Sequence, residues 1–393
     1  MAASAIGVVC GLIGTMFHFG VHEVTAFRGT HPWVLYLLPL AGFVIVSFYK
    51  LTETDGLGTD DIIDAVHEGK RLPILLLPAI FFGTVLTHLC GGSAGREGAA
   101  LQMGGTIGQC MGRTFRLDDR DLRVATLAGM AAFFSALFGT PLAATVFAIM
   151  VISIGVLYHV ALYPSLLAAL VAYGVSVRLG VEPTRFTVAV PDQSVGMFVR
   201  VAALGVLCAL VSILFCKLMH GAGHLMKRIK NPWLRVICGG FAVIALTWVF
   251  GTDYNGAGMD IVTRAIEQET VAVPWAFLLK LVFTAVTLAA GFKGGEVVPS
   301  FFVGATFGCA VSPLLGLPVG FGAAVGLAAV FCGVTNCPVA STLLAVELFG
   351  AEGMLYFALA CCLSYMLSGY QGLYSSQTIL YSKLKAQFIN VHT

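Results

Sequence analysis

Long apolar runs follow one another along most of this chain, separated by short polar or glycine-rich segments. Leu72–Leu89, Val199–Phe215, Val236–Phe250 and Trp275–Ala290 are examples of such runs. Runs of this length are typical of helices that cross the hydrocarbon core of a bilayer. Because no long polar stretch interrupts the series, we expect no separate soluble domain. The pattern predicts an all-α integral membrane protein with many passes.

The composition supports this prediction. Of the 393 residues, 58% are hydrophobic and 11% are charged, whereas about a quarter of the residues in a soluble protein are charged. The net charge of +2 gives no reason to expect a nucleic-acid partner. We therefore expect a multi-pass protein of the cell (plasma) membrane, with the lipid bilayer as its surroundings and without a cofactor.

Two segments of the chain are similar to each other. Ala131–Ile149 and Ala328–Val346 are identical at seven of nineteen aligned positions, including a proline. A glycine-flanked glutamate precedes each proline, by 44 residues for Glu97 and by 42 residues for Glu296. Chance matching of alanines does not explain both spacings. We predict a duplication, with residues 1–190 as the first repeat of the transmembrane domain and 195–393 as the second, inverted repeat.

Glycine and proline interrupt several apolar segments after few residues. Gly104–Gly112, Pro299–Pro313 and Pro338–Gly350 are therefore expected to form helices too short to span the membrane. Duplicated membrane folds with interrupted helices in matching positions bind a small solute between the repeats, near the midplane. We expect such a site here.

The segment GREGAALQMGG begins one of these helices and contains Glu97. The first amides of a helix have no partner within the helix and attract anions. A carboxylate and a free anion would compete for those amides, so protonation of Glu97 would couple proton binding to anion occupancy. The alternative is that Glu97 only caps the helix or pairs with Arg96. In GGEVVP, Glu296 is either a second acid or a cap, and Pro299 is expected at the first helical position.

These motifs, taken in order, resemble those of the CLC chloride channel and transporter family. GREGAALQMGG is similar to its G-[KR]-E-G-P motif, GGEVVPSFFVG to its G-x-F-x-P motif, and GLYSS to the segment with its late tyrosine. The resemblance implies an antiparallel inverted repeat of many tilted and broken helices, and a homodimer with one pathway in each subunit. It also implies that Glu97 is the gating and proton-coupling residue. The implied anion-binding positions are Leu57, Gly95, Arg96, Gly98, Val297, Val298 and Tyr374.

Departures from the family pattern point to a particular anion. Leu57 stands where the family has a serine that donates to chloride, and Val151 stands where chloride–proton exchangers have an inner glutamate. Together with Glu296, these departures make the chain resemble the fluoride/proton antiporter clade of the family. We therefore predict fluoride export coupled to proton exchange. A CLC-type chloride channel or chloride/proton transporter is the alternative, because Val298 replaces an expected threonine.

An intramembrane enzyme is a more distant alternative. It would need a serine–histidine pair or a metal site at membrane depth, and the HExxH pattern of zinc hydrolases is absent. His18 with His22, and His220 with His224, have the spacing of neighbours on one helix face. We interpret them as histidines near helix ends rather than as metal ligands, and we predict no metal site.

Overall fold

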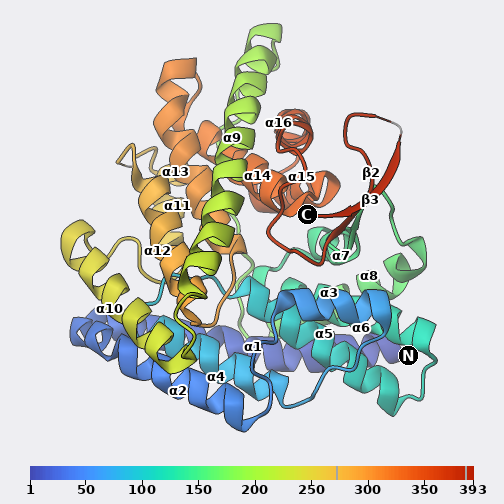
Figure 1. The fold of residues 1–393 in the computed structure, drawn as a ribbon. Helices are drawn as coiled ribbons and strands as arrows, with labels where there is room; N and C mark the ends of the chain where they lie inside the picture. Colours follow the sequence, from blue (N-terminus) through green and yellow to red (C-terminus); the bar gives the residue numbers. More distant parts are fainter. Residues whose placement is uncertain (271–272, 386) are drawn as a thin grey trace.

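A computed structural model describes residues 1–393 except 271, 272 and 386. Two sets of eight α-helices make up most of the described structure (Figure 1). The first set is α1 (Ala2–Thr30), α2 (Leu38–Leu51), α3 (Thr59–Glu68), α4 (Leu76–Leu89), α5 (Glu97–Thr114), α6 (Asp119–Phe138), α7 (Pro141–Met150) and α8 (Leu162–Arg178). The second set is α9 (Val195–Met226), α10 (Pro232–Phe250), α11 (Met259–Glu267), α12 (Ala276–Ala290), α13 (Val297–Leu315), α14 (Val319–Thr335), α15 (Pro338–Phe349) and α16 (Met354–Leu367).

The two sets pack in the same way. α5 lies along α6 as α13 lies along α14, and α1 contacts α8 as α9 contacts α16. The sets meet where α2 contacts α10, where α7 contacts α15, and where α5 contacts α13. The interval between the two predicted repeats, residues 191–194, lies in the segment that joins α8 to α9. This matched packing is the arrangement expected of a duplicated membrane fold.

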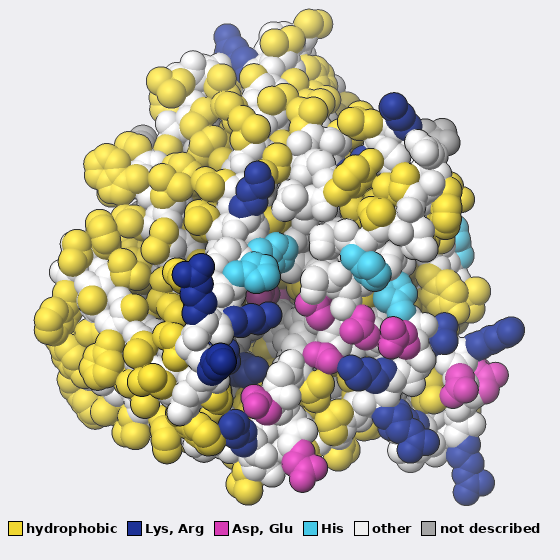
Figure 2. Space-filling view, in the orientation of Figure 1, with side chains coloured by type: hydrophobic (Ala, Val, Ile, Leu, Met, Phe, Trp, Pro, Cys, Tyr) yellow, Lys and Arg dark blue, Asp and Glu magenta, His cyan; other side chains and the backbone are white. Residues whose placement is uncertain are grey.

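Membrane spanning is supported by helix length and by the surface. In the described part of the chain, seven helical segments are long and apolar enough to cross a bilayer. Large apolar side chains such as Trp248, Val249 and Leu314 are more than two-thirds exposed. Figure 2 shows mostly hydrophobic side chains along the left and upper outline of one face, with charged side chains and histidines gathered from its centre to the lower right. An apolar outline of this kind suits contact with lipid.

The break between α6 and α7 is built like the break between α14 and α15. Gly139 ends α6 with a φ of 68°, and Asn336 ends α14 with a φ of 60°. Glycine and asparagine are the residues that adopt this left-handed conformation most readily. Pro141 and Pro338 then begin the next helices, where a missing N–H leaves no bond unmade. The local sequence therefore explains both breaks.

The prediction of a short helix is wrong for two of the three segments. Gly104–Gly112 lies inside the 18-residue α5, and Pro299–Pro313 lies inside the 19-residue α13, so only α15 is short as expected. The glycines of α5 allow close packing instead of breaking the helix. A Cβ atom added to Gly104 would collide with the backbone of Gly129 in α6. Small residues at helix contacts have this role in membrane proteins.

A small sheet, which the sequence did not predict, closes one side of the fold. β1 (Ser153–Ile154) pairs in parallel with β2 (Thr378–Tyr381), and β2 pairs in antiparallel with β3 (Phe388–His392). Lys383 follows β2, and its ammonium group donates hydrogen bonds to Asn336, Tyr365 and Ser368. These contacts hold the C-terminal segment against the ends of α14 and α16.

Candidate functional site

The first turns of α5 and α13 meet at two glycine-rich segments. The backbone of Gly95 bonds to that of Gly295 in both directions, with both N···O distances 2.8 Å. A Cβ atom at Gly98 would lie 2.9 Å from the Cα atom of Gly295. Because such a contact is too close for any side chain, only glycines allow the two helix starts to approach this far. Both starts therefore bring their free amides to one region.

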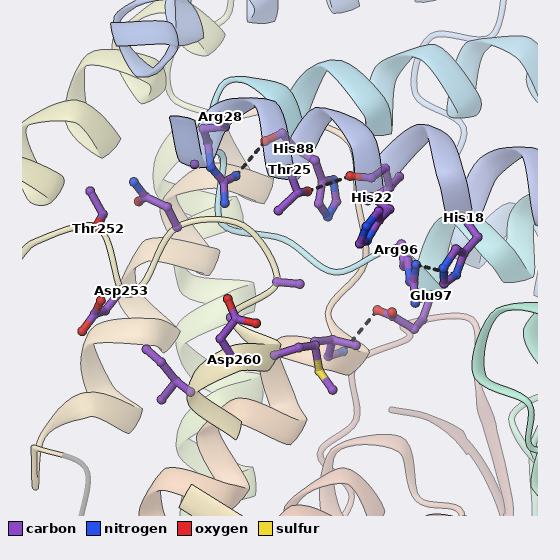
Figure 3. Close-up of a pocket in the computed structure, with 18 of the residues that line it drawn as sticks. His18, His22, Thr25, Arg28, His88, Arg96, Glu97, Thr252, Asp253 and Asp260 are labelled. Carbon is purple, nitrogen blue, oxygen red and sulfur yellow. Dashed lines mark hydrogen bonds between the residues drawn. The ribbon is translucent and has the colours of Figure 1, made fainter. Parts of the chain in front are cut away.

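Glu97 is the first residue of α5, and its side chain is fully buried. Its Oε2 atom accepts a hydrogen bond from the backbone N–H of Val298, with an N···O distance of 3.3 Å (Figure 3). Its Oε1 atom has no partner in the described structure. The sequence predicted that Glu97 occupies amides of its own helix, but this amide belongs to the start of α13. The carboxylate therefore lies at the positive end of a helix from the other half of the chain.

Glu296 has the reciprocal position. It is the N-cap residue of α13, and its Oε2 atom would lie 3.6 Å from a Cβ atom added to Gly98 in the first turn of α5. Each glutamate thus lies beside the helix start of the opposite half. Pro299 is the third residue of α13 rather than the first, because the helix begins at Val297.

A cavity of about 530 Å³ opens on the Glu97 side of the junction. Its lining includes Glu97, Arg96 and Val298 from the junction, and three histidines (Figure 3). Arg96 donates a hydrogen bond to Nδ1 of His18 at 3.1 Å. Lys70–Asp61 is the one ion pair within 4 Å in the described part of the chain, so Arg96 forms no such pair with Glu97. We call this space the larger cavity.

Several residues that sequence analysis missed shape the larger cavity. His88 is buried and faces the cavity; its Nδ1 bonds to the carbonyl of Thr84, and its Nε2 has no partner in the described structure. Lys280, fully buried in α12, donates to the carbonyls of Tyr254 and Gly256 at 3.1 and 2.6 Å. These bonds hold the loop that lines the cavity. A lysine inside an apolar segment is costly, and that signal could have identified Lys280.

A second cavity, of about 260 Å³, lies on the Glu296 side. Leu57, Glu296 and Tyr374 all line it, as the family resemblance implied. The Tyr374 side chain is 3% exposed, and its hydroxyl has no hydrogen-bond partner in the described structure. Because a buried hydroxyl without a partner is costly, this group is available to a ligand. We call this space the smaller cavity.

Asp60 and Asp61 fix the loops around the smaller cavity. Asp60 accepts hydrogen bonds from Ser375 and Ser376, which follow Tyr374, at 2.7 and 3.1 Å. Asp61 accepts from the backbone of Gly58 at 2.9 Å and pairs with Lys70 at 3.2 Å. The hydrogen bond and charge of Asp61 raise the pKa of Lys70. Both carboxylates are therefore occupied by donors of the protein.

The structure thus brings most of the predicted site residues together. The residues at the meeting of α5 and α13 are Gly95, Glu97, Gly98, Gly295, Val297 and Val298. Arg96 is turned toward His18 instead. Val151 is fully buried, and its carbonyl accepts from Gln377 at 3.0 Å.

In the described residues, no three His, Cys, Asp or Glu side chains are grouped as metal ligands would be. The fold and junction define a polytopic membrane protein with a polar cavity on either side of two facing helix starts.

Comparison with known proteins identifies the family. Residues 40–369 match the family described as voltage gated chloride channel. The chain is 38% identical over 393 residues to a chloride/fluoride channel protein of Pseudomonas syringae pv. tomato, covering 97% of this chain and 86% of that protein. The chain belongs to the voltage gated chloride channel family.

Other relatives and solved structures agree with this assignment. An H(+)/Cl(-) exchange transporter ClcA of Vibrio campbellii is 25% identical over 382 residues, which cover 88% of this chain and 81% of that protein. The crystal structure of a CLC-type fluoride/proton antiporter matches with a TM-score of 0.93 and 33% identity, covering 96% of this chain and 97% of that one. A slow cyanobacterial Cl-/H+ antiporter matches with a TM-score of 0.79 at 20% identity, which shows the fold alone. The predicted CLC-type fold is confirmed.

Proposed function

We propose that this protein exports fluoride across the cell (plasma) membrane in exchange for protons. The observation that carries the proposal is the reciprocal placement of Glu97 and Glu296 at the junction of α5 and α13. The larger cavity reaches Glu97, and the smaller cavity reaches Glu296 and Tyr374. The anion path is proposed to run between these cavities, past the backbone of Gly95, Gly98, Val297 and Val298, with Leu57 and Arg96 beside it. The role is transport rather than an enzymatic reaction.

Coupling is proposed to arise because Glu97 and the anion compete for the same donor. In its charged form, the carboxylate holds the Val298 N–H. Protonation removes the charge, weakens that bond and leaves the positive end of α13 free for an anion. An anion that takes the amide in turn favours release of the protonated side chain. Glu97 thereby links the movement of protons to the movement of the anion.

Fluoride is favoured over chloride by the donors near the smaller cavity. A protonated Glu296 could donate a short, strong hydrogen bond, which suits a small and tightly hydrated anion. Leu57 offers no hydroxyl for a chloride site, and Val151 provides no inner acid. The 38% identity to a chloride/fluoride channel protein and the likeness to a fluoride/proton antiporter support the same proposal.

A chloride channel or chloride/proton transporter is the second candidate. Val298 in place of threonine favours it, as does the similarity to H(+)/Cl(-) exchange transporters. Purified protein in liposomes separates the candidates. We expect a fluoride gradient to dissipate faster than an equal chloride gradient, with protons moving in exchange. Chloride flux equal to or above fluoride flux would replace the first candidate with the second.

The role of Glu97 is tested in the same liposomes. Glu97→Gln removes the titrating group while keeping size and polarity, so we expect fluoride-driven proton movement to fall to the level of empty liposomes. Glu347→Gln is the matched control. Glu347 is an acid whose oxygens accept from Leu142 and Ala143 at 3.1 and 2.8 Å, and it lines neither of the two cavities. Retained coupling in Glu97→Gln would show that another group carries the proton.

A further inference from the structure

We propose a second anion-binding station in the smaller cavity, formed by Tyr49, Thr84 and Lys293. None of these residues was singled out by the sequence motifs. Tyr49 lies in α2, Thr84 in α4 and Lys293 in the segment between α12 and α13. All three line the smaller cavity. The proposal rests on the proposed transport function and adds a site to its path.

Two buried hydroxyls face this cavity without a partner. Tyr49 is 1% exposed and Thr84 is 0% exposed, and neither side-chain oxygen has a hydrogen bond in the described structure. Other buried helical threonines behave differently: the hydroxyl of Thr87 donates to the carbonyl of Gly83 at 2.9 Å, and that of Thr106 to Gln102 at 2.8 Å. A buried hydroxyl that bonds neither to its own helix nor to a neighbour needs a ligand or water.

Lys293 supplies the positive charge. Its ammonium nitrogen lies 4.1 Å from the centre of the Tyr49 ring, a cation–π contact that holds it beside this ring. In the part of the chain that the structure describes, no carboxylate lies within 4 Å of Lys293. Asp60 and Asp61, which line the cavity, already accept hydrogen bonds from other groups. Asp55 and Glu296 are the further acids near Lys293 or the cavity. The ammonium is therefore free to attract an anion.

The chemistry of the three groups fits a small monovalent anion. Two hydroxyls and one ammonium can give three hydrogen-bond donors to a halide, and the charge of the ammonium disfavours a cation at the same place. A cavity of about 260 Å³ has room for such an ion together with several waters. The station differs from the position at Leu57 and Tyr374, because its donors come from α2, α4 and the segment before α13. It would hold an anion before or after it reaches the junction.

The proposal is tested by calorimetric titration of purified protein with sodium fluoride and, separately, with sodium chloride. Tyr49→Phe and Thr84→Val each remove one hydroxyl at nearly constant shape, and Lys293→Met removes the charge. We expect each variant to weaken anion binding by about tenfold, since hydrogen bonds and charges to an ion contribute at this level. Thr84→Ser and Lys293→Arg should restore most of the affinity.

The control is Thr106→Val, which removes a buried hydroxyl of α5 that bonds to its own helix and does not line the cavity. It should bind anions as the natural protein does. If all three test variants bind fluoride and chloride within twofold of the natural protein, the hydroxyls face water only and the proposal is wrong. The titration measures binding of both anions, whereas the liposome assay measures fluoride transport. A failure of fluoride transport would therefore contradict the proposed function, but it would not show whether Tyr49, Thr84 and Lys293 bind an anion.

Discussion

Tyr374 carries a hydroxyl group whose loss should affect the ligand rather than the fold. The side chain is 3% exposed and lines the smaller cavity, yet its oxygen bonds to no group in the described structure. Asp60 holds the following serines in place, so the ring is positioned by its loop and by packing. The hydroxyl is therefore free to serve a ligand.

Tyr374→Phe should weaken fluoride binding by about tenfold, because it removes one donor to a charged ligand. It should leave the thermal unfolding midpoint in detergent unchanged or slightly raised, since no protein hydrogen bond is lost. Tyr163→Phe, on an exposed ring of α8, is the control and should change neither quantity. Equal affinity in Tyr374→Phe and the natural protein would remove Tyr374 from the anion site.

At the scale of elements, the junction depends on how closely α5 and α13 approach each other. Their starts touch backbone to backbone through Gly95 and Gly295, and Gly98 packs against the same segment. The nearest groups to a Cβ atom added to Gly98 belong to the backbone of Gly295 and Gly294. Any added atom must move one helix relative to the other, which displaces the amides that Glu97 contacts.

Gly98→Ala tests this dependence. The added Cβ atom would lie 2.9 Å from Gly295 Cα and 3.3 Å from the Gly294 carbonyl oxygen, so backbone must shift. We expect a loss of roughly 1–3 kcal/mol in stability, seen as a lower unfolding midpoint, together with reduced anion flux. Gly174→Ala in α8 is the matched control, because nothing lies within 4 Å of its added atom. That variant should be neutral or more stable by up to about 1 kcal/mol.

At the scale of the whole molecule, the larger and the smaller cavity, together with Glu97, Glu296 and Tyr374, lie within one chain. Every residue that we propose for the anion path belongs to this one chain. The resemblance to the CLC family implies a homodimer, and we propose one here with an independent pathway in each subunit. The exposed apolar flanks leave ample surface for contact with a second copy as well as with lipid.

Mixed dimers test this independence. Natural chains and Glu97→Gln chains with different tags are co-expressed, and dimers with one of each are isolated by two affinity steps. We expect half the proton movement of the natural dimer, because one pathway remains intact. Complete loss of coupling would show that the subunits depend on each other. Cross-linking in mild detergent that gave only single chains would contradict the dimer itself.

The sequence by itself determined the class of protein and much of the site. Apolar run lengths predicted a membrane protein, and Pro338 marked the start of the short helix α15, because these signals are local. Glu97 was identified from its glycine-flanked helix start. The site residues Leu57 and Tyr374 were found only through resemblance to a family, since no local pattern marks them.

Only the tertiary structure decided which groups meet. The amide that Glu97 contacts lies 201 residues away in the sequence, and the bond depends on two helix starts from opposite halves. The glycines of α5 and α13 gave no sign of whether they break a helix or pack it, because close packing depends on a partner helix. Tyr49, Thr84 and Lys293 are likewise separate in the sequence and adjacent in the fold. Local patterns specify helices and their ends, whereas a binding site depends on long-range contacts that no local pattern encodes.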